Sequence, residues 1–163
     1  VATGILHNDK LQPEKSLRDI EAANMLTSFQ VNTIGPTLLA KHLLPAMPRD
    51  RKSVFAVLSA RVGSISDNRL GGWLSYRSSK AALNMSMATL AIEHRRRCAD
   101  GIVVALHPGT VDTPLSEPFA SRVPAKQLFD ADLAAGQLLQ VIDGLDAADS
   151  GGFFAWDGSP ISY

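Results

Sequence analysis

The sequence contains a single cysteine, Cys98, among its 163 residues. One thiol excludes a disulfide within the chain and a zinc site built from several cysteines. His94 and Cys98 are too few for a metal site, and the sequence has neither the His-Glu-x-x-His motif of zinc proteases nor the Gly-x-Ser-x-Gly motif of α/β-hydrolases. We therefore expect no metal centre, and a free cysteine fits a reducing, cytoplasmic environment.

Net charge and long apolar runs are also missing. The 16 basic and 16 acidic side chains give a formal net charge of zero, which removes the positive field that non-specific nucleic-acid binding requires. The longest apolar segments stay well below the roughly 18 residues of a transmembrane helix. With 45% hydrophobic residues and no Gly/Ser-rich or Pro-rich linker, residues 1–163 are expected to form a single domain that binds neither nucleic acid nor membranes.

Short apolar segments rich in β-branched residues alternate with longer segments of helical periodicity. Continuously apolar strands between helices are typical of a parallel sheet covered on both faces, which is an α/β fold of the doubly wound, Rossmann-like type. In the last predicted helix, Leu133, Leu138, Leu139 and Ile142 are expected to face the core. The expected strands are residues 1–6, 53–59, 102–107 and 152–156, and the expected helices are residues 16–47, 75–97 and 130–145.

Tyr76 and Lys80 stand at the start of the central predicted helix, directly after a strand and its loop. Their spacing of four residues places both side chains on one helix face. A phenol has a pKa near 10, and a neighbouring ammonium group favours the phenolate and lowers that pKa. The pair therefore predicts a tyrosine that exchanges a proton with a carbonyl or alcohol oxygen, at the sheet edge where open parallel sheets bind ligands.

Four segments together resemble the short-chain dehydrogenase/reductase family: YRSSKAALN at 76–84, the serine-containing end of strand 53–59, FQVNTIGP at 29–36 and HPGTVDT at 107–113. SARVGSISDN and the terminal WDG further resemble its C-factor-like carbonyl reductase branch. The resemblance implies that Tyr76 is the general acid/base, that Lys80 lowers its pKa and binds the nicotinamide ribose, and that Asn32 holds a water in a proton relay. It also implies NADP or NAD as cofactor, a small carbonyl or alcohol substrate, and a homodimer or homotetramer formed through the helices that carry Asn32 and Tyr76.

The serine of the family pattern has two candidates. The family usually ends this strand with two serines and uses the second, whereas this sequence has Ser59 followed by Ala60. Neighbouring strand residues point to opposite faces, so Ser59 is not a simple replacement for a hydroxyl at position 60. Ser64, in the loop that follows, is slightly favoured over Ser59 as the catalytic serine.

Pro36 lies four residues after Asn32 in a helical stretch and has no N–H to bond the Asn32 carbonyl. That carbonyl is therefore a candidate water acceptor, and the alternative is an ordinary kink at Gly35–Pro36.

The segment after strand 102–107 turns at the carboxyl edge of the sheet, through His107, Pro108 and Gly109. The resemblance implies that Pro108, Gly109, Val111 and Thr113 wrap the nicotinamide, and that residues 114–129 form a lid over the substrate. Trp73, Leu115 and Phe119 are candidates for an apolar pocket. His7, His42 and His107 are interpreted as ordinary surface or core histidines.

A glycine-rich turn after a first strand, which lets the backbone approach a pyrophosphate, is missing. By analogy with the family, we expect roughly 80 to 90 residues to precede Val1 in a complete protein and the sheet to have an unprotected edge here. The chain is interpreted as the C-terminal catalytic and nicotinamide-binding part of an NAD(P)-dependent oxidoreductase. The alternative is a non-enzymatic remnant of such an enzyme that acts as a dimerisation or signalling module.

Overall fold

A parallel three-stranded sheet with the order β1-β2-β5 forms the centre of the molecule. The computed structural model describes residues 1–120, 124 and 127–163. Val54 of β1 lies opposite Ile102 of β2, and Ala105 of β2 lies opposite Phe153 of β5. The strands are β1 (Ser53–Leu58), β2 (Gly101–His107) and β5 (Phe153–Ala155).

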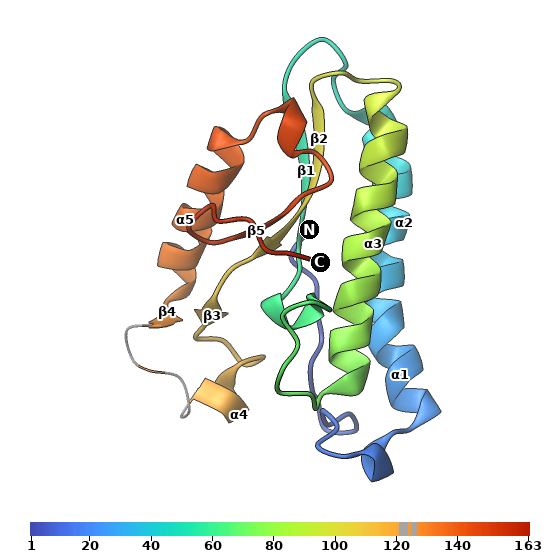
Figure 1. Ribbon diagram of the computed structural model, residues 1–163, viewed down its shortest axis with the longest axis vertical. Coiled ribbons are helices and arrows are strands. Elements are labelled where there is room, and N and C mark those ends of the chain that lie inside the picture. Colours follow the sequence, from blue (N-terminus) through green and yellow to red (C-terminus); the bar gives the residue numbers. More distant parts are fainter. Residues whose placement is uncertain (121–123, 125–126) are drawn as a thin grey trace.

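Helices cover both faces of this sheet, as the predicted doubly wound α/β fold requires (Figure 1). Helices α2 and α3 lie on one face and α5 lies on the other. Asp130 begins α5 by accepting a hydrogen bond from the amide of Leu133 at 2.7 Å. The helices are α1 (Ala22–Phe29), α2 (Gly35–Leu43), α3 (Leu74–Arg95), α4 (Glu117–Ala120) and α5 (Ala131–Gly144).

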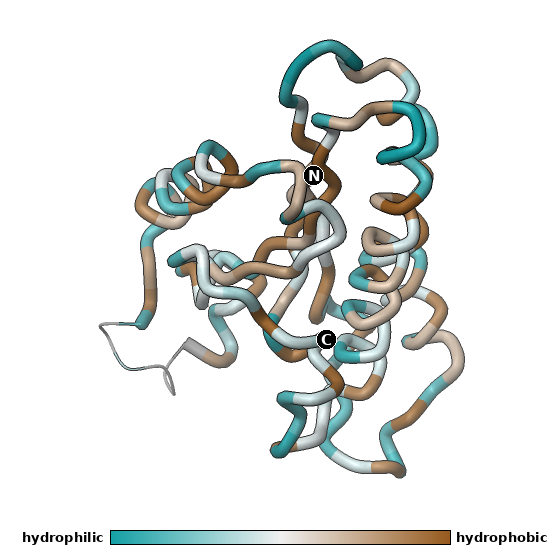
Figure 2. Tube along the Cα trace, turned by 45° about the horizontal axis from the view of Figure 1, so that its top comes forward, coloured by the Kyte–Doolittle hydropathy of each residue, from teal (hydrophilic) through white to brown (hydrophobic). Residues whose placement is uncertain are grey.

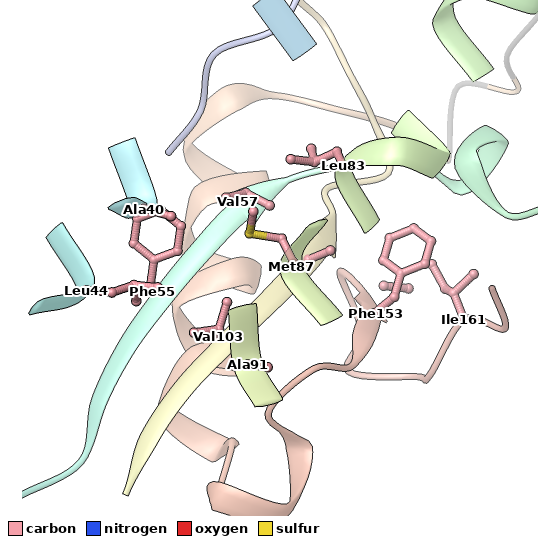
Figure 3. Close-up of a cluster of buried hydrophobic side chains, with 12 residues drawn as sticks. Ala40, Leu44, Phe55, Val57, Leu83, Met87, Ala91, Val103, Phe153 and Ile161 are labelled. Atoms are coloured by element: carbon pink, nitrogen blue, oxygen red, sulfur yellow. The ribbon is translucent and has the colours of Figure 1, made fainter. Parts of the chain in front are cut away.

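The core has two parts, one on each face of the sheet. The larger part joins α2 and α3 to the sheet in one cluster, in which Leu83 and Met87 of α3 and Val103 of β2 are all fully buried (Figure 3). The smaller part joins the opposite face of β2, including Ile102, to Leu138 and Ile142 of α5. Strand β2 is buried on both faces, which explains its continuously apolar sequence.

Three details of the predicted elements are wrong. Residues 1–6 do not form a strand, although the Val1 carbonyl accepts a bond from the Leu58 amide at 2.9 Å along the outer edge of β1. The predicted helix 16–47 begins only at Ala22 and is interrupted by a π-helical segment, Gln30–Ile34. In α5, Leu133 and Leu139 are 48% and 60% exposed, because Ala134, Leu138, Val141 and Ile142 form its inner face.

A second, two-stranded sheet was not predicted. It pairs β3 (Thr110–Val111) with β4 (Leu128–Phe129) in parallel, just beyond the end of β2. Part of the predicted lid 114–129 lies outside the described residues, namely 121–123 and 125–126. Among the residues that the structure describes, no helix combines the length and apolar composition needed to cross a membrane.

Candidate active site

A cavity of about 590 Å³ opens at the carboxyl ends of β1 and β2. Ser59 and Ala60 continue β1 into its wall, and the segment from His107 to Val111 continues β2 into it. Most of the wall is apolar, and Tyr76 and Lys80 reach it from the first turns of α3. The cavity therefore lies at the sheet edge where the sequence predicts a ligand site.

The Tyr76 and Lys80 side chains are both buried and lie next to each other. Tyr76 is 9% exposed and Lys80 is 3% exposed. The Lys80 Nζ lies 5.8 Å from the centroid of the Tyr76 ring and donates a hydrogen bond to the Leu58 carbonyl at 2.8 Å. This bond fixes the ammonium group at the end of β1, beside the phenol.

The protonation of this pair differs from the sequence-based prediction. Burial raises the pKa of Tyr76 to about 12, and burial lowers the pKa of Lys80 to about 8. The predicted lowering of the tyrosine pKa by its lysine neighbour is not found, and burial is the cause of the raised value, because removal from water disfavours the charged phenolate. At neutral pH the phenol is therefore protonated.

Asn32 does not line the cavity but holds together the segments beneath it. Its Oδ1 accepts from the Ile5 amide at 2.7 Å, and its Nδ2 donates to the Ile5 carbonyl at 2.9 Å and to Ser79 Oγ at 3.0 Å. The side chain therefore anchors the N-terminal segment to α3. Asn32 lies within the π-helical segment that precedes Pro36, so the helix is irregular where the missing proline N–H predicts it.

Neither candidate serine directs its hydroxyl to Tyr76. Ser59 lines the cavity, but its Oγ donates to Asn84 Oδ1 at 2.6 Å. The slightly favoured Ser64 is absent from the cavity wall, and its Oγ donates to the Ser162 carbonyl at 2.5 Å. Ala60, which follows Ser59 in the wall, carries no hydroxyl.

The loop after β2 contributes all four residues that the sequence assigns to it. Pro108, Gly109, Val111 and Thr113 line the cavity. Gly109 has a φ of +78°, and a Cβ at this position would come within 2.6 Å of the Phe129 ring. Only glycine fits this turn, which brings the backbone of the wall close to β4.

The predicted apolar pocket is also present. Trp73, Leu115 and Phe119 line the cavity, and the Trp73 and Phe119 ring centroids are 4.6 Å apart. Trp73 has a left-handed backbone, with φ 53° and ψ 43°, which is rare for a residue with a large side chain. This conformation turns the chain into α3 just before Tyr76.

Sequence reasoning missed Glu14, which supports the site, and interpreted His107 as an ordinary surface or core histidine. Glu14, which is 3% exposed, accepts hydrogen bonds from the Ser75 amide and hydroxyl and so caps α3, while its carbonyl accepts from the Trp73 amide at 2.6 Å. No sequence signal marks this contact, because Glu14 and Ser75 are 61 residues apart. His107 lines the cavity, and burial, followed by the charge of Arg61, lowers its pKa to about 4.

The cavity suits the nicotinamide and ribose of a dinucleotide in size and chemistry. Lys80 offers a buried ammonium group, Thr110 and Thr113 lie in the wall as hydroxyl-bearing residues, and most of the remaining wall is apolar. The orphaned Nδ1 of His107, which is buried without a hydrogen-bond partner among the described residues, marks an additional unfilled polar contact beside this wall.

Comparison with known proteins agrees with this geometry. The family model for short chain dehydrogenases matches residues 3–123. C-signal of Myxococcus xanthus is 36% identical over 149 residues, which is 91% of this chain and 84% of that protein. A 1-hydroxy-2-glutathionyl-2-methyl-3-butene dehydrogenase of Rhodococcus sp. is 35% identical over 136 residues, covering 83% of this chain and 57% of that protein.

Among solved structures, NADPH-bound carbonyl reductase from chicken fatty liver superposes with a TM-score of 0.79 at 29% identity. The superposition covers 98% of this chain and 64% of the reductase. The chain thus spans less than two thirds of that reductase and of the Rhodococcus dehydrogenase, and most of C-signal. The predicted resemblance to the C-factor-like carbonyl reductase branch is confirmed. The chain belongs to the short-chain dehydrogenase/reductase family of NAD(P)-dependent oxidoreductases.

Proposed function

We propose that this chain carries the catalytic part of a carbonyl reductase that transfers a hydride between a nicotinamide cofactor and a small carbonyl or alcohol substrate. The observation that carries the proposal is the buried pair of Tyr76 and Lys80, which face one mainly apolar cavity at the carboxyl edge of the sheet. When bound, the nicotinamide supplies or accepts the hydride. Lys80, Pro108, Gly109, Val111 and Thr113 would hold its nicotinamide and ribose.

Tyr76 has the role of proton donor in the reductive direction. A carbonyl oxygen that gains a hydride on its carbon becomes a strongly basic alkoxide, which takes the phenolic proton. That phenol carries its proton at neutral pH, as a phenol with the ordinary pKa near 10 also does, and burial raises the pKa further, to about 12. Lys80, whose ammonium lies beside the ring, compensates the negative charge left on the tyrosine oxygen. Asn32 lies outside the cavity wall and positions α3 through its hydrogen bond to Ser79. The role in a water relay that the family resemblance implies for Asn32 is also part of this proposal.

Carbonyl polarisation by a serine is the weakest part of the family pattern in this chain. The hydroxyls of Ser59 and Ser64 are hydrogen-bonded to Asn84 and Ser162, and Ala60 has none. Ser59 is the better candidate of the two, because it lines the cavity. A site with few hydrogen-bond donors for the substrate oxygen suits substrates whose carbonyl group is already electrophilic, such as aromatic aldehydes.

The cofactor is proposed to be NADP rather than NAD, since the matched carbonyl reductase is described as NADPH-bound. The site for the reaction is proposed to be cytoplasmic, because the single cysteine is free and buried.

The test uses the 163-residue chain itself. Titration with NADPH and NADH by calorimetry, with thermal unfolding in parallel, is expected to show saturable binding and a raised Tm. Reduction of 4-nitrobenzaldehyde is expected to fall at least about 100-fold in Tyr76→Phe. Tyr163→Phe removes the hydroxyl of the only other tyrosine, which donates to the Gly151 carbonyl outside the cavity, and serves as the matched control. Unchanged turnover in Tyr76→Phe contradicts the mechanism.

A second candidate function is a non-enzymatic signalling or dimerisation module. The observation in its favour is that the chain spans 84% of a protein named C-signal but 57% of the Rhodococcus dehydrogenase. Calorimetry separates the two candidates, because a module without cofactor chemistry binds neither NADPH nor NADH and is indifferent to Tyr76→Phe.

Both candidate functions are compatible with a homodimer or homotetramer, which we propose to form through the helices that carry Asn32 and Tyr76. These helices expose large apolar side chains. In Figure 2 hydrophobic residues, coloured brown, alternate with hydrophilic ones, coloured teal, along the same helices. Sedimentation analysis is expected to show a dimer or tetramer that Leu38→Glu dissociates, whereas Leu70→Glu, in the loop before α3, leaves it intact. The exposed residues are Leu26, Ile34, Leu38, Leu43, Met85 and Ile92.

A further inference from the structure

A second cavity lies at the opposite end of the sheet from Tyr76. Arg49 precedes β1 and Cys98 precedes β2, so this cavity opens at the amino-terminal edge, near the loops at the top of Figure 1. Its volume is about 180 Å³. That volume corresponds to roughly six water molecules and so admits a small ligand.

The floor of this cavity is apolar and buried. Ala40 and Leu44 of the α2 region are 0% and 8% exposed, and the half-buried Leu90 of α3 faces them. Cys98 closes one side and donates to the Pro48 carbonyl at 3.4 Å. These side chains offer an aliphatic chain a surface from which water is excluded.

The rim is cationic. Lys41, Arg49 and Arg97 line it and are exposed, whereas Glu93 is the only acid among the described residues that line it. No side-chain hydrogen bond or ion pair joins any of the three cations to a described residue. Arg49 and His94 line the same cavity, and burial, followed by the charge of Arg49, lowers the pKa of His94. Three free cations against one carboxylate favour an anion at the mouth.

His94 itself belongs to the wall and not to the anion contact. Its Nε2 faces Gly101, where a Cβ would come within 2.4 Å of it. The imidazole is 7% exposed and separates the floor of the cavity from β2.

We propose that this cavity binds a small amphipathic anion, a short aliphatic chain with a carboxylate or phosphate head, with the chain on Leu44 and Leu90 and the head between Arg49 and Arg97. Guanidinium groups match the geometry of both head groups. The competing structural role of these cations is to complement the carboxyl ends of α2 and α3, since Lys41 lies in the last turn of α2 and Arg97 closely follows the end of α3 at Arg95. A binding site predicts saturable binding of an amphipathic anion, whereas a purely helix-end role predicts none.

Calorimetry with hexanoate tests the proposal, with 1-hexanol and acetate as probes for the chain and the head alone. Hexanoate is expected to bind saturably and more tightly than either part. Methyl NMR signals of Leu44 and Leu90 are expected to shift during the titration. The same comparison is made for the phosphate head group, with hexyl phosphate as the complete ligand and inorganic phosphate as the head alone. No saturable binding of hexanoate or hexyl phosphate overturns the proposal, as does equal binding of hexanol, which leaves the cations with their helix-end role.

The double variant Arg49→Gln/Arg97→Gln is expected to weaken hexanoate binding about tenfold, since each exposed charge contact contributes modestly. Arg51→Gln/Arg96→Gln removes the same charge from neighbouring positions outside the cavity and is the matched control. Leu90→Trp fills the floor and is expected to abolish binding, with the Tm showing that the variant is folded. Equal weakening by both double variants contradicts a localised head-group site.

Discussion

Asn32 Nδ2 donates a hydrogen bond to Ser79 Oγ at 3.0 Å, and Ser79 Oγ in turn donates to the Tyr76 carbonyl at 2.8 Å. This chain of bonds links the irregular π-helical segment to the turn of α3 that presents Tyr76 and Lys80. The position of the proton donor therefore depends on a side chain 44 residues earlier in the sequence.

Replacement of Asn32 is expected to reduce stability more than removal of an ordinary helical asparagine. Asn32→Ala leaves the buried amide and carbonyl of Ile5 unpaired, at a cost of about 2–4 kcal/mol in the free energy of unfolding. Asn24→Ala in α1 is the control, and urea unfolding is the measurement. Equal free energies of unfolding for the two variants contradict the anchoring role.

Lys80→Met is expected to stabilise the chain at pH 7. The lysine pKa is about 8 in the folded state and near 10.5 when unfolded, so the unfolded chain binds more protons between these values and wild-type stability rises with pH across that window. Below pH 8 the buried charge costs about 1–3 kcal/mol, which the methionine avoids. Thermal unfolding at pH 7 and 10 measures the difference. An equal gain in stability at both pH values, or an equal gain in the exposed control Lys10→Met, contradicts a cost from the buried Lys80 charge.

His107→Asn is expected to make the chain less sensitive to acid. The folded-state pKa of His107 is about 4 and the unfolded value is near 6.5, so wild-type stability falls as the pH falls through this window. The wild type is expected to lose about 2 kcal/mol more than the variant between pH 7 and pH 4.5. Denaturant unfolding at the two pH values gives this number, with the exposed His42→Asn as control. Parallel acid losses in all three proteins contradict the assignment.

Ala60→Ser is expected to raise carbonyl reduction about tenfold, because it adds a hydroxyl to the cavity wall that can donate to the substrate oxygen. Ala2→Ser places a hydroxyl elsewhere in the same wall and is the control. The measurement is kcat with 4-nitrobenzaldehyde and NADPH. If kcat rises equally in both variants, or does not rise in Ala60→Ser, the lack of a hydroxyl at position 60 does not limit carbonyl reduction.

Glu14→Ala is expected to destabilise the chain by about 1–2 kcal/mol, because it uncaps α3 next to Tyr76. Glu21→Ala removes a glutamate that makes no capping hydrogen bond at the start of α1. Urea unfolding compares the two variants, and a loss in Glu21→Ala as large as that in Glu14→Ala contradicts the capping role.

The fold was predictable because its signals are local. The apolar runs 53–59 and 102–107 and the helix start at Asp130 lie where the structure has β1, β2 and the first residue before α5. The break in the first helix was less visible, since a π-helical segment depends on how Asn32 packs against α3.

The details of the site depend on partners far away in the sequence. Spacing alone brought Tyr76 and Lys80 together, but it did not indicate that burial controls the pKa of Tyr76. The directions of the Ser59 and Ser64 hydroxyls depend on Asn84 and Ser162, which accept their hydrogen bonds. No local pattern contains that information, because tertiary contacts decide where each hydroxyl points.

The two tryptophans of the chain both lie at the candidate active site. Trp73 lines the cavity, and Trp156 lies against Gly109 on its wall with its ring centroid 4.8 Å from that of Phe129. Intrinsic fluorescence is therefore an unlabelled optical reporter of this site. A reduced nicotinamide bound there is expected to quench the tryptophan emission by energy transfer. An anion bound at the opposite end of the sheet is expected to leave the emission unchanged. A single fluorescence titration therefore distinguishes occupancy of the two cavities.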